Sequence, residues 1–114
     1  MLCGVDKQVG EPLPLHRQSL YRFGKDRTVV DVPTDHPSCS RQHSVLQFRQ
    51  TVKSGQSEVR PYIMDLGSVN GTFIGGIKIE TARFYELLPQ DCLKFGQSTR
   101  EYVLLHEDLT NADN

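Results

Sequence analysis

The sequence predicts an all-β protein, an antiparallel β-sandwich of about ten to eleven short strands with ligand-binding loops at one end. Runs rich in β-branched and aromatic residues are separated by Gly, Pro, Asn and Ser, with a turn signal roughly every 8–12 residues. No stretch has the 3.6-residue periodicity of an amphipathic helix. At 114 residues, the chain is long enough for a single buried core.

In the N-terminal third of the chain, some segments have a clear strand pattern and others only a weak one. Gly and Pro interrupt its first residues, so we expect only short extended pieces there, at Leu2–Val5 and Leu13–His16. Ser19–Phe23 alternates aromatic and polar residues, which predicts a strand. Thr28–Val32 is rich in β-branched residues and predicts the next strand, which Pro33 ends.

The middle of the chain predicts a hairpin of two longer strands. His43–Arg49 has apolar residues at alternate positions, Ser54–Ser57 is a polar tip, and Glu58–Leu66 returns as the second strand. The remaining strands are shorter and lie between turn signals such as Asn-Gly and Gly-Gly. They are expected at Thr72–Ile74, Ile77–Ile79, Phe84–Leu87, Cys92–Phe95 and Tyr102–Leu105.

These elements divide the chain into three parts. We expect residues 1–18 to form an N-terminal extension partly packed on the domain. The domain itself is expected at residues 19–107, and a frayed polar tail at residues 108–114.

Composition excludes several classes of function. With 13 basic and 14 acidic residues the net charge is −1, so no overall field favours nucleic acid or anionic lipid. No apolar run approaches the roughly 20 residues that span a bilayer, and the first residues lack a secretory signal pattern. Three cysteines at irregular spacing, Cys3, Cys39 and Cys92, suit a reducing compartment, the cytosol or the nucleus.

Two loops carry most of the chemically useful side chains. Asp35–His43 contains small hydroxyl and basic residues just before a strand, and Asp65–Thr72 contains turn residues that tolerate left-handed backbone. If the intervening strands pair, both loops open at the same end of a sheet. Hydroxyls, backbone N–H groups and cations at such an end are suited to hold an anion on a peptide.

Three short motifs, taken in order and spacing, resemble the forkhead-associated (FHA) domain family. They are Gly24-Lys25, Ser40-x-x-His43 and Asn70-Gly71-Thr72. The resemblance covers about residues 21–107. Flanking stretches such as Pro61-Tyr-Ile-Met-Asp-Leu-Gly-Ser68 are similar to one subgroup of this family. That subgroup includes the Smad nuclear-interacting protein, plant Dawdle and a yeast subunit of the pre-mRNA retention and splicing complex.

The resemblance implies a phosphothreonine-binding site. Ser40 is expected to donate its hydroxyl and backbone N–H to the phosphate, with Arg41 and Lys25 as cations beside it. Asn70 is expected to hydrogen-bond the ligand main chain, and Val69 to line the space for the threonine methyl group. Gly24, His43 and Gly71 are expected to support the loops structurally.

Two positions depart from the family pattern. The family usually has Gly-Arg where this chain has Gly24-Lys25, and a lysine lacks the planar fork that meets a phosphate with two bonds. The position before the Asn is commonly Ser or Thr, whereas here it is Val69, which has no hydroxyl. Both departures are expected to weaken or retune phosphate binding.

Metal and enzyme chemistry are both disfavoured. His36, Cys39 and His43 have zinc-ligand chemistry, but a fourth ligand is not evident nearby, so we expect no metal and no cofactor. Ser40, His43 and Asp65 are the three residue types of a hydrolase catalytic triad, but the sequence lacks the Gly-x-Ser-x-Gly motif that carries the nucleophile in many such enzymes. We therefore expect no enzyme activity.

The sequence thus predicts a phosphothreonine-peptide-binding module of a nuclear pre-mRNA splicing, retention or RNA-processing factor. Its expected partners are a phosphorylated protein and subunits of a splicing-associated complex, with no membrane and no direct nucleic-acid binding. A monomer is the default. The alternative is a scaffold subunit of such a complex, bound through a surface other than the phosphate site.

Overall fold

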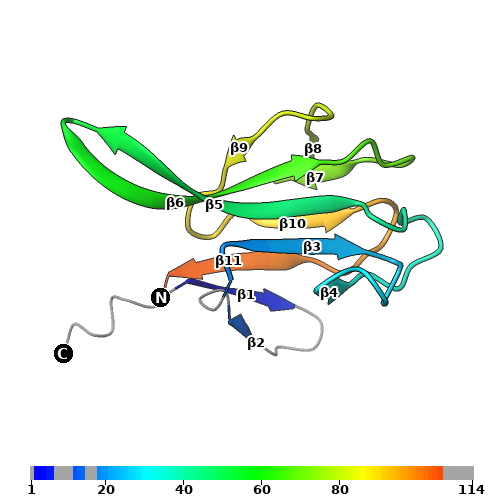
Figure 1. Ribbon diagram of the computed structural model, residues 1–114. Coiled ribbons are helices and arrows are strands. Elements are labelled where there is room, and N and C mark those ends of the chain that lie inside the picture. The colour runs from blue at the N-terminus through cyan, green and yellow to red at the C-terminus, as the bar shows by residue number, and fades with distance from the viewer. Residues whose placement is uncertain (1, 7–11, 15–17, 107–114) are drawn as a thin grey trace.

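The computed structural model describes residues 2–6, 12–14 and 18–106, and the described residues form eleven strands and no helix. Figure 1 shows the strands as two stacked layers, so the predicted all-β sandwich is confirmed. Accordingly, no helix in these ranges is long and apolar enough to cross a membrane.

The first layer is a six-stranded sheet. Its order is β2 (Pro12–Pro14), β1 (Leu2–Asp6), β11 (Tyr102–His106), β10 (Cys92–Phe95), β7 (Thr72–Ile74) and β8 (Ile77–Lys78). All of its strand pairs are antiparallel. The two N-terminal strands therefore extend this sheet beyond β11.

The second layer is a five-stranded sheet. Its order is β4 (Val32–Pro33), β3 (Leu20–Gly24), β5 (Ser44–Lys53), β6 (Gln56–Asp65) and β9 (Tyr85–Glu86). Only the β3–β4 pair is parallel; the other pairs in this sheet are antiparallel.

The β5–β6 hairpin is longer than predicted, with an unbroken register from Ser44 opposite Asp65 to Lys53 opposite Gln56. Its two turn residues, Ser54 and Gly55, have φ angles of 52° and 78°. Positive φ at both central residues is the geometry whose twist matches that of paired strands, so the turn and the ladder favour the same register. Figure 1 shows the hairpin projecting past the rest of the sandwich, away from the β3–β4 end.

The strand predicted at Thr28–Val32 is largely wrong. Residues 27–29 form a turn, and β4 contains only Val32 and Pro33. The carboxylate of Asp26 accepts hydrogen bonds from the backbone N–H and the hydroxyl of Thr28, at 3.0 and 2.6 Å. These local bonds fix a turn against the β propensity of the side chains. Pro33 lies inside β4 because an edge strand does not need every N–H.

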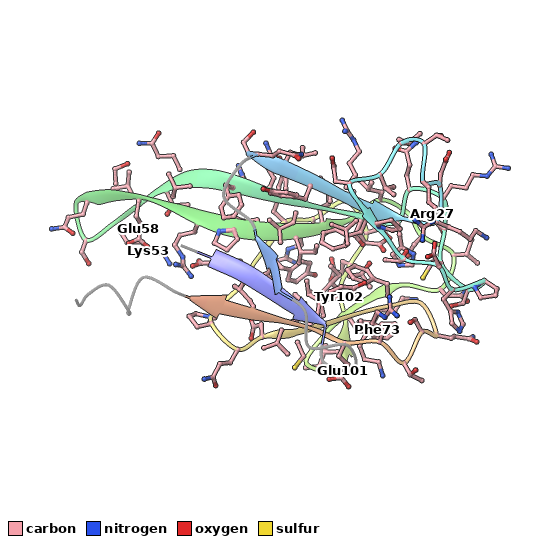
Figure 2. The ribbon with its side chains drawn as sticks, turned by 90° about the horizontal axis from the view of Figure 1, so that it is seen from below. Arg27, Lys53, Glu58, Phe73, Glu101 and Tyr102 are labelled. Carbon is pink, nitrogen blue, oxygen red and sulfur yellow. The ribbon has the colours of Figure 1, made fainter. Side chains whose placement is uncertain are left out.

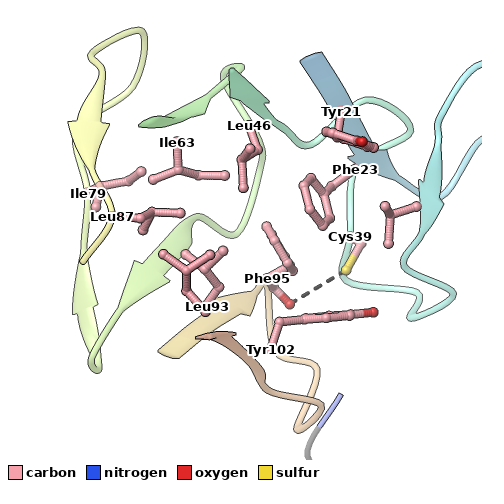
Figure 3. Close-up of a cluster of buried hydrophobic side chains, with 12 residues drawn as sticks. Tyr21, Phe23, Cys39, Leu46, Ile63, Ile79, Leu87, Leu93, Phe95 and Tyr102 are labelled. Atoms are coloured by element: carbon pink, nitrogen blue, oxygen red, sulfur yellow. Dashed lines mark hydrogen bonds between the residues drawn. The ribbon is translucent and has the colours of Figure 1, made fainter. Parts of the chain in front are cut away.

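The core lies between the two sheets (Figure 3), where inward-facing residues of β3, β5 and β6 meet those of β10 and β11. Phe23 and Phe95 stack across it with ring centroids 5.0 Å apart. Cys39, in the loop between β4 and β5, is buried in the same cluster, and its Sγ donates to the carbonyl of Phe95 at 3.5 Å. The core therefore anchors the β4–β5 loop as well as the strands.

Candidate functional site

Three loops gather at one end of the sandwich, the end to which β3 points in Figure 1. They connect β3 to β4 (residues 25–31), β4 to β5 (residues 34–43) and β6 to β7 (residues 66–71). Two bonds join the second and third loops directly. The N–H of Val69 donates to Ser40 Oγ at 3.1 Å, and the Asn70 amide donates to the Ser38 carbonyl at 2.8 Å. The common loop end expected from the sequence is thus present.

His43 holds these loops from inside. It is completely buried; its Nδ1 accepts from the N–H of Ser40 at 3.1 Å, and its Nε2 donates to the carbonyl of Gly71 at 2.7 Å. A carbonyl can only accept, so this pair of bonds requires the neutral ring with its proton on Nε2. Burial lowers the pKa of His43, although its bond to Gly71 and the charge of Asp65 act in the opposite direction.

Asp65 organises the β6–β7 loop, a role that our sequence reasoning missed. The buried carboxylate accepts from the N–H groups of Gly67 and Ser68 at 3.0 Å and from the hydroxyls of Ser68 and Thr72 at 2.6 and 2.7 Å. Burial alone would raise the pKa of Asp65, but these bonds outweigh it and hold the pKa below its usual value. An Asp two residues before Gly-Ser at a strand end, as in Asp65-Leu-Gly-Ser68, is the signal that identifies such an Asx-type loop.

Gly24 allows the β3–β4 loop to touch the β4–β5 loop. A Cβ atom at this position would lie 2.0 Å from the carbonyl oxygen of Arg41. The close approach lets the N–H of Lys25 donate to the Ser40 carbonyl at 3.0 Å and that of Asp26 to the Arg41 carbonyl at 3.1 Å. The backbone therefore places Lys25 and Arg41 beside Ser40.

The basic side chains of this end differ in whether they are paired. Arg27 forms an ion pair with Asp35, with its Nε 3.2 Å from one carboxylate oxygen and its Nη2 on the other. The side chains of Lys25 and Arg41 are exposed, and within the described residues neither forms an ion pair closer than 4 Å. Lys25 and Arg41 are therefore two cations at this end with no ion pair among the described residues, although the charge of Arg41 helps to lower the pKa of Asp26.

One expected donor is already used. The backbone N–H of Ser40, predicted to serve the phosphate, donates to His43 instead. The Ser40 hydroxyl oxygen accepts a hydrogen bond from the N–H of Val69, and this acceptor role still allows its own O–H to donate to another group. Asn70 donates one side-chain N–H to the Ser38 carbonyl. An Asn amide has a second N–H and a carbonyl oxygen in addition to that donor. Val69 itself is 82% exposed.

The zinc and triad alternatives do not match this geometry. No group of three or more His, Cys, Asp or Glu side chains in the described residues could hold a metal. His36 Nδ1 contacts Ser38 Oγ at 2.7 Å, whereas Cys39 faces the core. His43 accepts from the main chain of Ser40 rather than from its hydroxyl, so the side chains do not form a triad relay.

The comparisons with known proteins agree with this architecture. The FHA domain family model matches residues 21–96. The chain is 55% identical over 105 residues to the FHA domain-containing protein DDL of Arabidopsis thaliana, which covers 88% of this chain and 33% of that protein. It is also 55% identical over 98 residues to Smad nuclear-interacting protein 1 of Mus musculus, covering 82% and 26%. The chain thus spans a third or less of these curated relatives.

Solved structures give the same fold. The yeast Pml1 splicing factor, solved in a study of its integration into the RES complex, has a TM-score of 0.74 at 28% identity, covering 91% of this chain and 76% of that one. The MEK1 FHA domain, solved with a HOP1 pThr318 peptide, has a TM-score of 0.74 and covers 94% and 97%; its 20% identity shows the fold alone. The chain therefore belongs to the forkhead-associated (FHA) domain family, a family of binding modules.

Proposed function

We propose that this domain binds phosphothreonine peptides and acts, without catalysis, in a nuclear protein of pre-mRNA splicing or RNA processing. The observation that carries this proposal is the set of backbone bonds that places Lys25 and Arg41 beside Ser40 at one loop end, where the Ser40 hydroxyl also meets the β6–β7 loop. A phosphothreonine carries a charge of about −1.5 to −2 and three acceptor oxygens. One hydroxyl and two cations match those requirements.

The division of roles follows from the hydrogen bonds already made. Ser40 donates its hydroxyl to a phosphate oxygen, because its N–H is occupied by His43. Lys25 and Arg41 neutralise the phosphate. Within the residues that the structure describes, the Asn70 side chain bonds Ser38 through one N–H, so its carbonyl oxygen and other N–H are assigned to the ligand main chain. Val69, highly exposed and bonded to Ser40, contacts the threonine methyl group.

The names of the relatives support the cellular setting. One is called a Smad nuclear-interacting protein, and one solved structure of this fold is a yeast splicing factor. The MEK1 FHA domain, which has the same fold, was solved with a phosphothreonine peptide. A domain that recruits a phosphorylated protein to a splicing-associated complex agrees with all three, and we propose that it does so as a monomer.

The test is a titration of three versions of one peptide, carrying phosphothreonine, phosphoserine or unmodified threonine. We expect the phosphothreonine peptide to bind at least tenfold more tightly than the unmodified one. Ser40→Ala and Arg41→Ala should remove most of that difference while the melting temperature changes little. Arg27→Ala is the matched control, because Arg27 is paired with Asp35. Equal affinity for phosphorylated and unmodified peptide would refute the proposal.

A second candidate, a scaffold role through another surface, is favoured by the β5–β6 hairpin. Val52 and Val59 lie in its projecting half and are 71% and 60% exposed. In the register of the hairpin they lie on the same side of the strands as the buried Leu46 and Ile63, so the core-facing side becomes exposed toward the hairpin tip. If this role is correct, Val52→Ser with Val59→Ser should break assembly with splicing-complex subunits and leave phosphopeptide affinity unchanged.

A further inference from the structure

The projecting half of the β5–β6 hairpin leaves one edge of β6 without a neighbouring strand. β9 pairs with β6 at Tyr62 and Ile63, and the N–H of Leu87 donates to the carbonyl of Pro61 at 2.9 Å. From there to the hairpin tip, no strand among the described residues pairs with this side of β6. Figure 1 shows the hairpin extending past β9 toward its tip. The edge is therefore open along Gln56–Arg60.

The register shows which backbone groups this edge presents. In an antiparallel ladder, successive residues of a strand direct their N–H and C=O groups to opposite sides. The carbonyls of Pro61 and Asp65 accept backbone bonds on the β9 side of β6. By the same alternation, Ser57 and Val59 direct their N–H and C=O groups away from β5. Both residues are exposed, and these groups have no backbone partner among the described residues.

Pro61 shows that this side of β6 accepts a proline. It lies within the strand, yet the ladder with β5 is unbroken from Ser44 to Lys53. The ladder survives because the N–H that proline lacks would point away from β5. Val59 lies two residues away and has the same orientation. Val59→Pro should therefore remove one outward N–H and leave the hairpin paired.

The core-facing side of this edge is apolar. The exposed Val52 and Val59 lie on that side, and their polar neighbours Gln50 and Ser57 are bonded to each other through Nε2 and Oγ. On a strand added to the edge, the two residues that pair with Ser57 and Val59 would direct their side chains to this same side. Apolar side chains at those two positions would cover the valines.

The opposite face of the edge carries an acid. Glu58 is 4.0 Å from Nε of Arg60, and its side chain is 49% exposed. Glu86 holds the two cations of this face more closely, with Arg60 at 3.1 Å and Lys53 at 3.0 Å. Glu58 is thus a loosely paired carboxylate at the open edge. A residue directly opposite it on an added strand is favoured when it is basic and disfavoured when it is acidic.

We propose that the open edge of β6 binds an extended segment of a partner protein by β-strand addition. The segment pairs its backbone with Ser57 and Val59, lays two apolar side chains against Val52 and Val59, and places a Lys or Arg opposite Glu58. The partner therefore carries an apolar–basic–apolar alternation within an extended stretch of about five residues, the length of the open edge.

This edge lies far from the loops that hold the proposed phosphothreonine site. Figure 2 shows Lys53 and Glu58 at the opposite end of the domain from Arg27. Strand addition therefore goes beyond the phosphothreonine site and does not depend on it. It also gives the projecting hairpin a specific mode of binding, through backbone groups as well as exposed valines.

The test is an NMR titration of the isotope-labelled 114-residue chain with the end-blocked peptide Gly-Thr-Val-Lys-Val-Thr-Gly, whose pattern is the same in both directions. A second peptide has Glu in place of Lys. A third has N-methyl groups on both Val residues, which remove the donors that a ladder needs.

Three variants accompany the wild type: Val59→Pro, Val52→Pro and Glu58→Lys. Val52→Pro is the matched control. Val52 is an exposed valine of the same hairpin, and because it lies opposite Ser57 its N–H points to the other side of the ribbon, away from β6. Val59→Pro is shown to be folded if its amide signals outside the edge match those of the wild type.

For the wild type, the amide signals of Ser57 and Val59 should shift and saturate with the Lys peptide. The Glu peptide should bind about threefold more weakly. N-methylation of the peptide and Val59→Pro should each weaken binding about fivefold or more, whereas Val52→Pro should bind within about twofold of the wild type. Glu58→Lys should reverse the order of the Lys and Glu peptides.

Three results would overturn the proposal: no saturable shift at the edge, equal affinity for the Lys and Glu peptides, or binding that survives both N-methylation and Val59→Pro. A fourth would assign the edge to a second copy of this chain instead. It is a dimer seen by sedimentation without peptide, with concentration-dependent shifts at Ser57 and Val59, that Val59→Pro dissociates.

Discussion

The imidazole of His43 donates from Nε2 to the carbonyl of Gly71, 28 residues farther along the chain, over 2.7 Å inside the core. Through Nδ1 the same ring receives the N–H of Ser40. One buried side chain thus sets the distance between the loop that carries Ser40 and the loop that carries Asn70.

His43→Ala should therefore reduce both stability and ligand binding. Loss of the ring leaves a cavity beside Phe95 and two unpaired backbone groups, so we expect about 2–4 kcal/mol of destabilisation. Urea unfolding measures this free energy, and anisotropy measures phosphopeptide affinity. Ser40→Ala is the control, with weaker binding and little change in stability. A stable His43→Ala domain that binds normally would contradict the role assigned to the ring.

Stability should fall in two steps as the pH is lowered. The folded-state pKa of His43 is below its unfolded value near 6.5, so the unfolded chain binds the proton first and stability declines as the pH falls below about 6.5. The folded-state pKa of Asp65 is below 3.8, so its contribution is present above that pH and is lost as the pH falls through the folded-state pKa. Melting temperatures from pH 8 to pH 3 report both steps.

Two variants assign the steps. His43→Gln should lack the upper step, and Asp65→Asn should reduce the lower one, to which Asp26 and Glu86, whose pKa values are also lowered, contribute. If each variant keeps the complete profile of the wild type, other groups control the acid sensitivity.

Gly24→Ala should separate the β3–β4 and β4–β5 loops. The new methyl group would clash with the Arg41 carbonyl, and relief of that clash requires backbone movement that we expect to cost about 2–3 kcal/mol. Lys25 and Arg41 would move apart, so phosphopeptide affinity should fall as well. Chemical denaturation and the peptide titration measure the two effects.

Gly75→Ala is the comparison for this variant. Gly75 has a φ of 57° and open space around its Cβ position, so only the strain of positive φ applies, about 1 kcal/mol. Equal destabilisation by the two substitutions would show that the close approach at Gly24 is unimportant.

Lys25→Arg combined with Val69→Thr should strengthen phosphopeptide binding. Arg supplies a planar fork in place of a point charge, and the Thr hydroxyl adds a donor beside Ser40. Both positions are exposed, so the melting temperature should change by little. Isothermal titration with the phosphothreonine peptide should give an affinity several-fold above the wild type. Unchanged or weaker binding would mean that Lys25 and Val69 do not limit the affinity of the pocket.

The local sequence pattern was sufficient to predict a strand wherever that strand buries one face in the core. The alternation through Leu46 and the turn at Ser54–Gly55 predicted the central hairpin, and the spacing of Ser40, His43 and Asn70 identified the loops that meet. Periodicity and turn chemistry are properties of neighbouring residues, so a single sequence contains them.

Which of several possible hydrogen-bond partners a polar group takes could not be predicted in this way. Thr28 has β propensity, yet the Asp26 carboxylate holds it in a turn. From the sequence we expected the N–H of Ser40 to bind the phosphate, but in the structure it donates to the buried ring of His43. The sequence suggested Asp65 only as a nominal triad member, whereas in the structure its carboxylate accepts hydrogen bonds from five donors.

The sequence by itself determined the fold class, the family and the end of the molecule where chemistry is concentrated, because these follow from local periodicity and short motifs. Only the tertiary structure decided which polar groups are already satisfied and which cations stay unpaired: Arg27 is paired with Asp35, whereas Lys78 lies across Gly71 with its charge unpaired among the described residues. The physical reason is that hydrogen bonds and ion pairs are assigned by distance in space, which the order of residues along the chain does not specify.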